Sequence, residues 1–174
     1  MRYSVGVEYA FHTLFYMVEM PSQSVIGIRA LAELHGISET YLSKIFTKLS
    51  KSGLVRAVSG VKGGYVLQRP AAQISFWDII EAVEGNSYLF QCAEIRQRNT
   101  LSDPASLSFD CPCAIKVIIS EGEDRMREYL RQQTLGELYK ETFATFSEEK
   151  QQAIYRWLEK IFVKYRKLLL THQI

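Results

Sequence analysis

The feature of this sequence that most constrains its fold is a pair of short helical patterns joined at a glycine. Apolar residues at helical spacing predict a first helix over residues 28–35, and Gly36 can adopt the left-handed conformation that ends such a helix. Ser38 stands where the N-cap of the next helix is expected, and Gly53 ends that helix. Two helices joined by a tight glycine turn predict a helix-turn-helix.

A glycine-rich hairpin follows this helix pair. Residues 54–58 and 65–67 are rich in apolar, strand-forming side chains and predict two short strands. The turn between them contains Gly60, Gly63 and Gly64, which we expect to adopt positive φ and to let the backbone approach a partner closely. A helix-turn-helix followed by such a hairpin predicts a winged helix-turn-helix.

Basic side chains are concentrated in this same part of the chain. Residues 38–70 carry six Lys or Arg side chains and one acidic side chain, although the net charge of the 174 residues is only +2. A basic segment on an otherwise neutral chain is either a solvated face or the electrostatic footprint of an anionic polymer. Together with the helix-turn-helix, it favours nucleic acid.

The rest of the sequence predicts further helices and one long loop. The expected fold is mainly α with a small β wing: a winged helix-turn-helix plus a long dimerisation helix and an extra C-terminal helix. Its expected parts are a DNA-binding domain at 1–85, a cysteine-bearing sensor loop at 86–113, a dimerisation helix region at 114–146 and a C-terminal helical extension at 147–174. The apolar stripe of the helix near 114–133 is longer than one small domain can cover, which favours pairing between two copies.

Several classes of protein are excluded or disfavoured by what the sequence lacks. It shows no Cys-x-x-Cys motif, no Ser/His/Asp set, no Walker loop and no dinucleotide fingerprint, so we do not expect an enzyme. No run of 18 apolar residues and no secretory signal is present, so we expect a cytoplasmic protein that does not enter a membrane. A protein adaptor that kept the winged fold remains an alternative, against which the basic residues argue.

The three cysteines of the chain all lie in or at the end of the long loop. Cys92 is followed after 18 residues by Cys111-Pro112-Cys113. An odd number of cysteines in a reducing compartment argues against structural disulfides. They are buried filler, reactive thiols or metal ligands, and their type alone does not decide which.

Four stretches resemble the Rrf2 family of winged-helix transcription regulators, which includes IscR, NsrR and CymR. They are the helix-turn-helix stretch 36–55, the wing 60–67, the stretch 74–85 that contains Asp78-Ile79-Ile80-Glu81-Ala82, and the Tyr9-Ala10 pair. The resemblance implies a dimeric DNA-binding regulator, often a repressor, that binds an inverted repeat. Many family members carry an iron–sulfur cluster that reports redox, nitric oxide or iron state, and others respond without a cluster to partner proteins or small molecules.

On this resemblance, the helix that begins after Ser38 is the recognition helix and enters the major groove of DNA. The wing suits the minor groove, where Lys62 would supply positive charge. Lys51 is a further candidate for phosphate contact, and the ring of Tyr41 has core packing as its alternative role. The candidate DNA-binding residues are Ser38, Thr40, Tyr41, Ser43, Lys44, Lys48, Arg56, Lys62, Gly63 and Gly64.

The cluster-bearing relatives keep three closely spaced cysteines in this loop, and the wide spacing here departs from that pattern. A cluster needs about four ligands, and Glu8 and His12, four residues apart on one helix face, could supply two of them. The candidate metal site therefore combines Glu8 and His12 of one chain with Cys92 and either Cys111 or Cys113 of the other. Ligands of this mixed kind favour a 2Fe–2S cluster.

Three alternatives to the cluster remain open. One is a zinc site that uses Cys111, Cys113 and His12, although their spacing fits no standard zinc motif. Another is a thiol sensor in which Cys92 forms a disulfide under oxidation. The last is a cluster-free regulator controlled by a small ligand or a partner protein.

Overall fold

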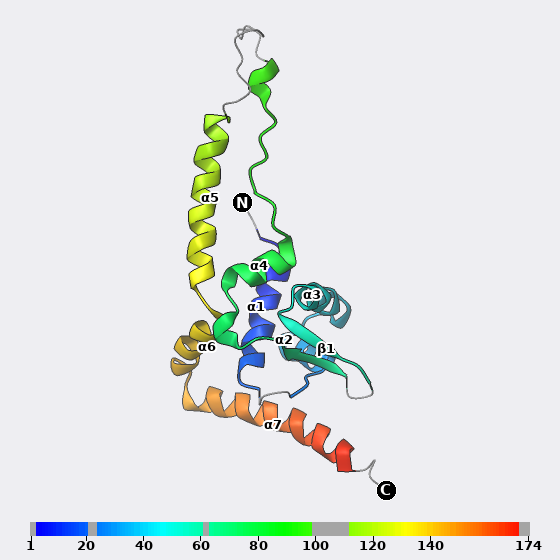
Figure 1. The fold of residues 1–174 in the computed structure, drawn as a ribbon. Helices are drawn as coiled ribbons and strands as arrows, with labels where there is room; N and C mark the ends of the chain where they lie inside the picture. The colour runs from blue at the N-terminus through cyan, green and yellow to red at the C-terminus, as the bar shows by residue number, and fades with distance from the viewer. Residues whose placement is uncertain (1–2, 21–23, 61–62, 99–111, 171–174) are drawn as a thin grey trace.

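The computed structural model of the chain describes residues 3–20, 24–60, 63–98 and 112–170, and their side chains except at 97–98 and 162–170. The described elements follow one another as shown in Figure 1: α1 (Val5–Val18), α2 (Ile28–His35), α3 (Glu39–Lys51), β1 (Val55–Val58), β2 (Gly64–Leu67), α4 (Phe76–Glu84), α5 (Ala114–Gln132), α6 (Leu135–Ala144) and α7 (Glu148–Leu170), with 3-10 turns at Ala71–Gln73 and Ile95–Arg98. The predicted mainly α fold with a small β wing is confirmed.

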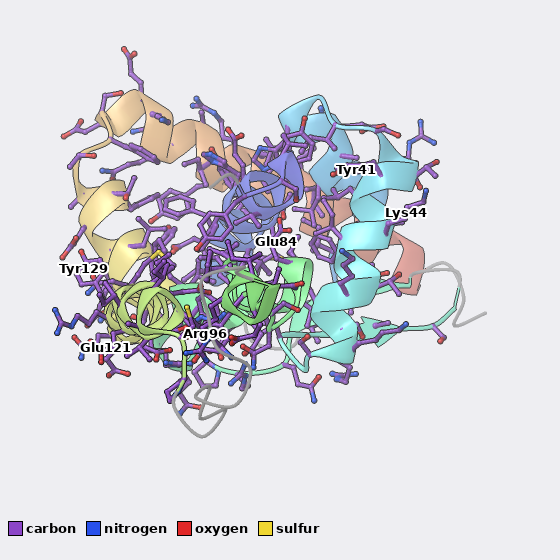
Figure 2. The ribbon with its side chains drawn as sticks, turned by 90° about the horizontal axis from the view of Figure 1, so that it is seen from above. Tyr41, Lys44, Glu84, Arg96, Glu121 and Tyr129 are labelled. Atoms are coloured by element: carbon purple, nitrogen blue, oxygen red, sulfur yellow. The ribbon has the colours of Figure 1, made fainter. Side chains whose placement is uncertain are left out.

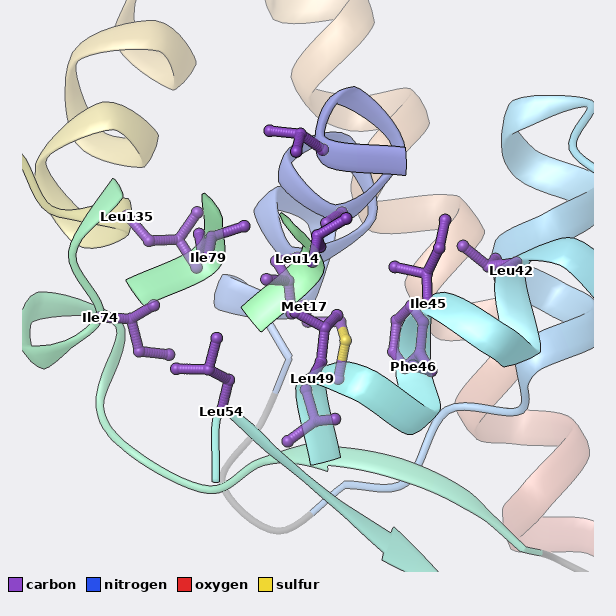
Figure 3. Close-up of a cluster of buried hydrophobic side chains, with 14 of the residues drawn as sticks. Leu14, Met17, Leu42, Ile45, Phe46, Leu49, Leu54, Ile74, Ile79 and Leu135 are labelled. Carbon is purple, nitrogen blue, oxygen red and sulfur yellow. The ribbon is translucent and has the colours of Figure 1, made fainter. Parts of the chain in front are cut away.

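The core lies where α1, α3 and α4 meet. The apolar stripe of α3 is buried, because Leu42, Ile45, Phe46 and Leu49 are each no more than 4% exposed. They pack with side chains such as Leu14 of α1 in one continuous cluster (Figure 3). Burying this face leaves the opposite face of α3 to solvent, which is the arrangement that a recognition helix requires.

Glycines shape both turns of the helix-turn-helix and the wing, but in two different ways. Gly36 and Gly60 have positive φ values of 63° and 113°, as expected. The expectation of positive φ is wrong for Gly63 and Gly64, which are glycines because of close backbone contact. A Cβ at Gly63 would lie 2.6 Å from the Val58 carbonyl oxygen, and one at Gly64 would overlap the carbonyl oxygen of Ile26.

The wing is a two-stranded antiparallel hairpin with a third backbone partner. Val55 pairs with Leu67 at its base and Val58 pairs with Gly64 nearer its tip. Ile26, in the connection between α1 and α2, exchanges two backbone hydrogen bonds with Tyr65, at 3.0 and 2.9 Å. The wing is therefore fixed to the segment that precedes α2 by main-chain bonds of β2.

Two helix starts are capped and joined to each other. Ser75 with Asp78 begins α4, and Thr134 with Glu137 begins α6, each as a capping box. The two starts lie side by side, because the Phe76 N–H donates to the Gln133 carbonyl and the Leu135 N–H donates to the Ile74 carbonyl. The predicted cap at Ser38 is different: the residue holds the N-cap position of α3, but its side chain makes no capping hydrogen bond.

The helix α5 projects away from this body beside the chain segment that carries Cys92 (Figure 1). Its two buried residues are both charged, Glu123 and Arg127. Its predicted apolar stripe is largely open in the single chain, with Ile118 70% and Tyr129 62% exposed. A stripe of this kind is what a second copy of the helix would cover.

The last helix, α7, lies across one end of the molecule. Ile154 and Leu158 are buried, and Trp157 meets the ring of Tyr16 of α1 edge-on, with 6.1 Å between the ring centroids. The predicted start is confirmed, since the Lys150 N–H donates to the Ser147 hydroxyl at 3.3 Å. Within the described residues, no helix is both long enough and apolar enough to span a bilayer.

Candidate nucleic-acid interface and cysteine site

The solvent face of α3 carries the residues predicted to meet DNA. Thr40, Tyr41 and Lys44 are exposed in its first two turns, and Figure 2 shows Lys44 on the side of α3 away from α1. Both proposed roles of Tyr41 find a counterpart, because its ring packs edge-on against Tyr9 at 5.9 Å while the side chain stays 38% exposed. The side chain of Ser43 is half-buried on the same helix.

The side chains predicted to contact phosphate differ in whether they already have a bonding partner within the fold. Lys44, Lys51 and Arg56 are exposed and have no hydrogen-bond or ion-pair partner among the described residues. Lys48 is engaged within the fold, since its Nζ donates to the Val83 carbonyl at 2.6 Å and so ties α3 to the last turn of α4. The predicted contact of Lys62 lies outside the described residues.

The cysteine segment, residues 86–98, brings two of the three predicted thiols together: Cys92 in the segment and Cys113 at the start of α5. The thiols of Cys92 and Cys113 interact, although 20 residues separate them, and Cys113 holds the N-cap position of α5. Both side chains are half-buried. Beside them, Arg96 and Glu94 form an ion pair at 2.7 Å. Cys111 lies outside the described residues.

The surroundings of the two thiols differ in their electrostatics. The backbone N–H groups of Lys116 and Ile115, in the first turn of α5, lower the pKa of Cys113, and the hydrogen bond from Cys92 lowers it further. The Glu94 N–H lowers the pKa of Cys92, but desolvation and the neighbouring sulfur of Cys113 outweigh it and the pKa is raised. Cys113 is therefore the thiol that ionises first and Cys92 is the one that stays protonated.

The described part of one chain does not assemble a complete metal site. It contains no cluster of three or more His, Cys, Asp or Glu side chains arranged to hold a metal ion. Glu8 is exposed on α1, and the exposed His12 lies near His35 of α2, with 6.2 Å between the ring centroids. The predicted site, which combines Glu8 and His12 of one chain with cysteines of the other, stays a prediction.

The structure also shows residues that the sequence analysis missed. Arg127 and Glu123 form a buried ion pair at 2.6 Å on α5, next to the cysteine segment. Their spacing of four residues was a weak signal, since such pairs are common on exposed helix faces. Nothing in the local sequence indicated that this pair would be buried by partners about 40 residues away.

Comparisons with known proteins agree with this fold. The family model described as Rrf2, iron-dependent transcriptional regulator, matches residues 3–141. The HTH-type transcriptional regulator YwgB of Bacillus subtilis is 27% identical over 146 residues, which cover 80% of this chain and 89% of that protein. Among solved structures, the oxidised form of Staphylococcus aureus CymR is 29% identical with a TM-score of 0.57, covering 80% of this chain and 96% of that one. IscR of T. potens is 26% identical with a TM-score of 0.62, covering 85% and 93%.

Proposed function

Since the chain belongs to the Rrf2 family of transcriptional regulators, we propose that it binds an inverted-repeat operator as a homodimer and that its cysteine segment sets the affinity for DNA. The family and its relatives are DNA-binding regulators rather than enzymes. The observation that carries the proposal is that one chain presents three separate features. These are an exposed basic face on α3, an exposed apolar stripe on α5, and two interacting thiols where the cysteine segment meets α5.

DNA is bound by α3 and the wing. The first two turns of α3 enter the major groove, where Thr40, Tyr41 and Lys44 reach base edges and flanking phosphates. Arg56 and Lys51 add phosphate contacts, which give affinity rather than sequence preference. Lys62 reaches the minor groove, while the close packing of Gly63 shapes the tip of the wing and that of Gly64 lets the wing lie against the backbone of Ile26.

The dimer forms along α5. Its exposed Ile115, Ile118 and Tyr129 share one face with the partly covered Met126. Pairing this face with its counterpart in a second chain removes a large apolar surface from water, which favours association. Two recognition helices held at a fixed separation then match two half-sites of DNA.

The cysteine segment fits a soft-metal cofactor in part. Two adjacent, half-buried thiols are the donors that an iron–sulfur cluster prefers. Cys92 and Cys113 would hold the cluster together with Cys111 or with Glu8 and His12 of the second chain. When bound, a cluster of the 2Fe–2S type supplies a one-electron redox change. The residues of this chain fix the thiols at the start of α5 and keep them half-shielded from water.

The contact between Cys92 and Cys113 also favours a second candidate, a thiol switch without a metal. Hydrogen peroxide would oxidise the more acidic Cys113 to a sulfenic acid with release of water. The Cys92 sulfur would then displace the second oxygen as water and form a disulfide, so that two thiols and one peroxide give one disulfide and two waters. The related CymR of S. aureus has a crystal structure of an oxidised form.

One preparation separates these two signals. Protein purified without oxygen would be examined by visible absorption together with iron and sulfide assays. Charge-transfer bands with matching iron and sulfide support the cluster, and their loss in Cys92→Ala and Cys113→Ala supports these ligands. Colourless protein that loses two mass units and two free thiols in peroxide supports the disulfide. The regulatory proposal is contradicted if neither the wild type nor the cysteine variants change their affinity for a selected DNA duplex with redox state.

A further inference from the structure

A buried arginine joins the cysteine segment to the winged helix-turn-helix. The Arg127 side chain of α5 is held between two aromatic rings, with its guanidinium carbon 4.5 Å from the ring centroid of Trp77 and 4.3 Å from that of Tyr88. Trp77 belongs to α4, and Tyr88 belongs to the segment that leads to Cys92. The same guanidinium therefore contacts a helix of the DNA-binding half and the start of the cysteine segment.

Polar contacts fix the guanidinium in this position. It donates to Glu123 Oε1 at 2.6 and 3.1 Å, to Asn86 Oδ1 at 2.8 Å and to the Ser87 carbonyl at 2.9 Å. Glu123 is itself held by the segment, because its Oε2 accepts the Leu89 N–H at 3.0 Å. Arg127 is 4% exposed and Glu123 is 7% exposed, so a shift of the segment that broke these bonds would leave charges without water or partners.

The contacts continue from α4 to the recognition helix. Trp77 is one of four buried residues of α4. Near the end of α4, the Val83 carbonyl accepts from Lys48 of α3, and the Glu84 carboxylate accepts from the Ser4 N–H at the start of α1. The helix that receives Arg127 at one end is thus bonded to α3 and α1 at the other.

We propose that Arg127 is a positioning residue that couples the state of the cysteine segment to the placement of α3. A change at Cys92 and Cys113 moves the segment from 86 to 92, and the sandwich of Tyr88, Arg127 and Trp77 passes this movement to α4. Because Lys48 bonds α3 to the last turn of α4, the recognition helix follows. This inference rests on the proposed function, in which the cysteine segment controls DNA binding.

The test removes the buried pair without leaving a lone charge. The double variant Glu123→Gln with Arg127→Met keeps the length of the Glu123 side chain and an unbranched apolar stem at position 127, and it removes both charges together. The matched control is Glu33→Gln with Arg29→Met, since these residues form an exposed ion pair at 2.8 Å with the same spacing of four residues and lie on α2, away from Trp77. All proteins carry Trp157→Phe, so that Trp77 is the only tryptophan and its emission reports on the sandwich.

Two quantities are measured before and after treatment with hydrogen peroxide: the emission of Trp77, and the Kd for a DNA duplex selected from a random library with the wild type. In the parent and the control protein, we expect peroxide to change the Kd at least tenfold and to shift the emission. In the double variant, we expect the two Kd values to agree within about twofold and the emission to stay constant. The smaller of the two Kd values of the double variant should remain within about threefold of the smaller Kd value of the parent.

The outcomes separate this inference from the function on which it rests. If the parent protein changes its Kd and the double variant does so equally, the coupling role of Arg127 is wrong and the proposed function stands. If the Kd of the parent does not respond, redox control of DNA binding fails. In that case the emission of Trp77 alone tests the role of Arg127. The role is overturned if peroxide does not shift the emission of the parent, or if it shifts the emission of the double variant as much as that of the parent.

A second variant covers the case in which the double variant does not fold. Tyr88→Leu removes the exposed ring of the sandwich, together with the 2.7 Å hydrogen bond that its hydroxyl donates to Asp124, and leaves the ion pair of Arg127 and Glu123 in place. We expect its redox-dependent change in Kd to fall to a third or less of the parent value, with an unchanged melting temperature. A full redox response in this variant would contradict the proposal.

Discussion

The winged helix-turn-helix and the α5 arm of the same chain are built on opposite principles. The buried residues of α3 are Leu42, Ile45, Phe46 and Leu49, all apolar. The buried residues of the longer α5 are Glu123 and Arg127, both charged, while most of its large apolar side chains are exposed and Leu130 packs against the edge of the core. One half is completed by its own core, and the other is held to the body by an ion pair and two aromatic rings.

This contrast teaches which half can stand alone. Burial of apolar area stabilises a fold within one chain, so the helix-turn-helix needs no partner. A buried ion pair adds little net stability, because desolvation of the charges offsets their attraction. In the proposed dimer, a second copy covers the apolar stripe of the arm, and the contacts of Arg127 hold the arm to the body. The four predictions below test this contrast.

The largest effect is expected from shortening a side chain in the core of the winged helix-turn-helix. Leu49→Ala should lower the free energy of unfolding by about 2–5 kcal/mol, because it leaves a cavity at a fully buried position. The loss should be the same at every protein concentration, as measured by urea denaturation. The exposed Thr47→Ala is the control on the same helix, and a similar loss there would contradict the assignment of the core face.

A substitution in the exposed apolar stripe of α5 should instead act on formation of the dimer. Ile118→Glu places a charge in the exposed apolar stripe of α5, and we expect it to dissociate the dimer and weaken DNA binding about a hundredfold, since one half-site contact is lost. Sedimentation and DNA titration measure the two effects. Glu121→Lys, on another face of α5, should leave the dimer intact; a dimeric Ile118→Glu protein would refute the α5 interface.

Two lysines on one helix should separate DNA contact from internal support. Lys44→Ala should weaken DNA binding about tenfold and lower the salt slope by about 1, because a free surface charge is removed. Lys48→Ala should instead cost about 1 kcal/mol of stability through the lost bond to Val83, with a smaller change in slope. The roles are reversed if Lys48→Ala gives the larger change in slope in a salt titration.

The smallest expected effect is on the pH dependence of the stability of the winged helix-turn-helix. Burial lowers the pKa of His35, and the charge of His12 lowers it further, so unfolded protein binds more protons than folded protein just below pH 6.5. Stability should therefore be constant above about pH 7.5 and fall as the pH drops towards 5.5. In His35→Gln the fall in melting temperature should be smaller; an equal fall would show that other groups cause it.

Local rules predicted the helix boundaries from the sequence. Gly36 ends α2 in the left-handed conformation, Ser75 caps α4, and Ser147 begins α7, because each of these signals acts within a few residues. The sequence also indicated that the apolar stripe of α5 exceeds what one chain can cover. The basic face of α3 followed from its amphipathic pattern in the same way.

Contacts between distant residues could not be predicted in this way. The bond from Lys48 to Val83 spans 35 residues and that from Arg127 to Asn86 spans 41. Gly64 was recognised as special, but the reason, an overlap with Ile26, depends on a bridge that no turn rule contains. The contact of Cys92 with Cys113 likewise required the folded segment, because their separation in sequence fits no ligand motif.

The join between the starts of α4 and α6 has a mechanical consequence for α5. This join holds the C-terminal end of α5 through the backbone bonds at Gln133 and Leu135, while Cys113 lies at the opposite end. The 19 residues of α5 make a rod about 28 Å long, so a tilt of about 5° at its fixed end displaces Cys113 by about 2 Å. Under the proposed function, a displacement of about 2 Å at the thiols would therefore correspond to only a small rotation of α5 at its end next to the winged helix-turn-helix.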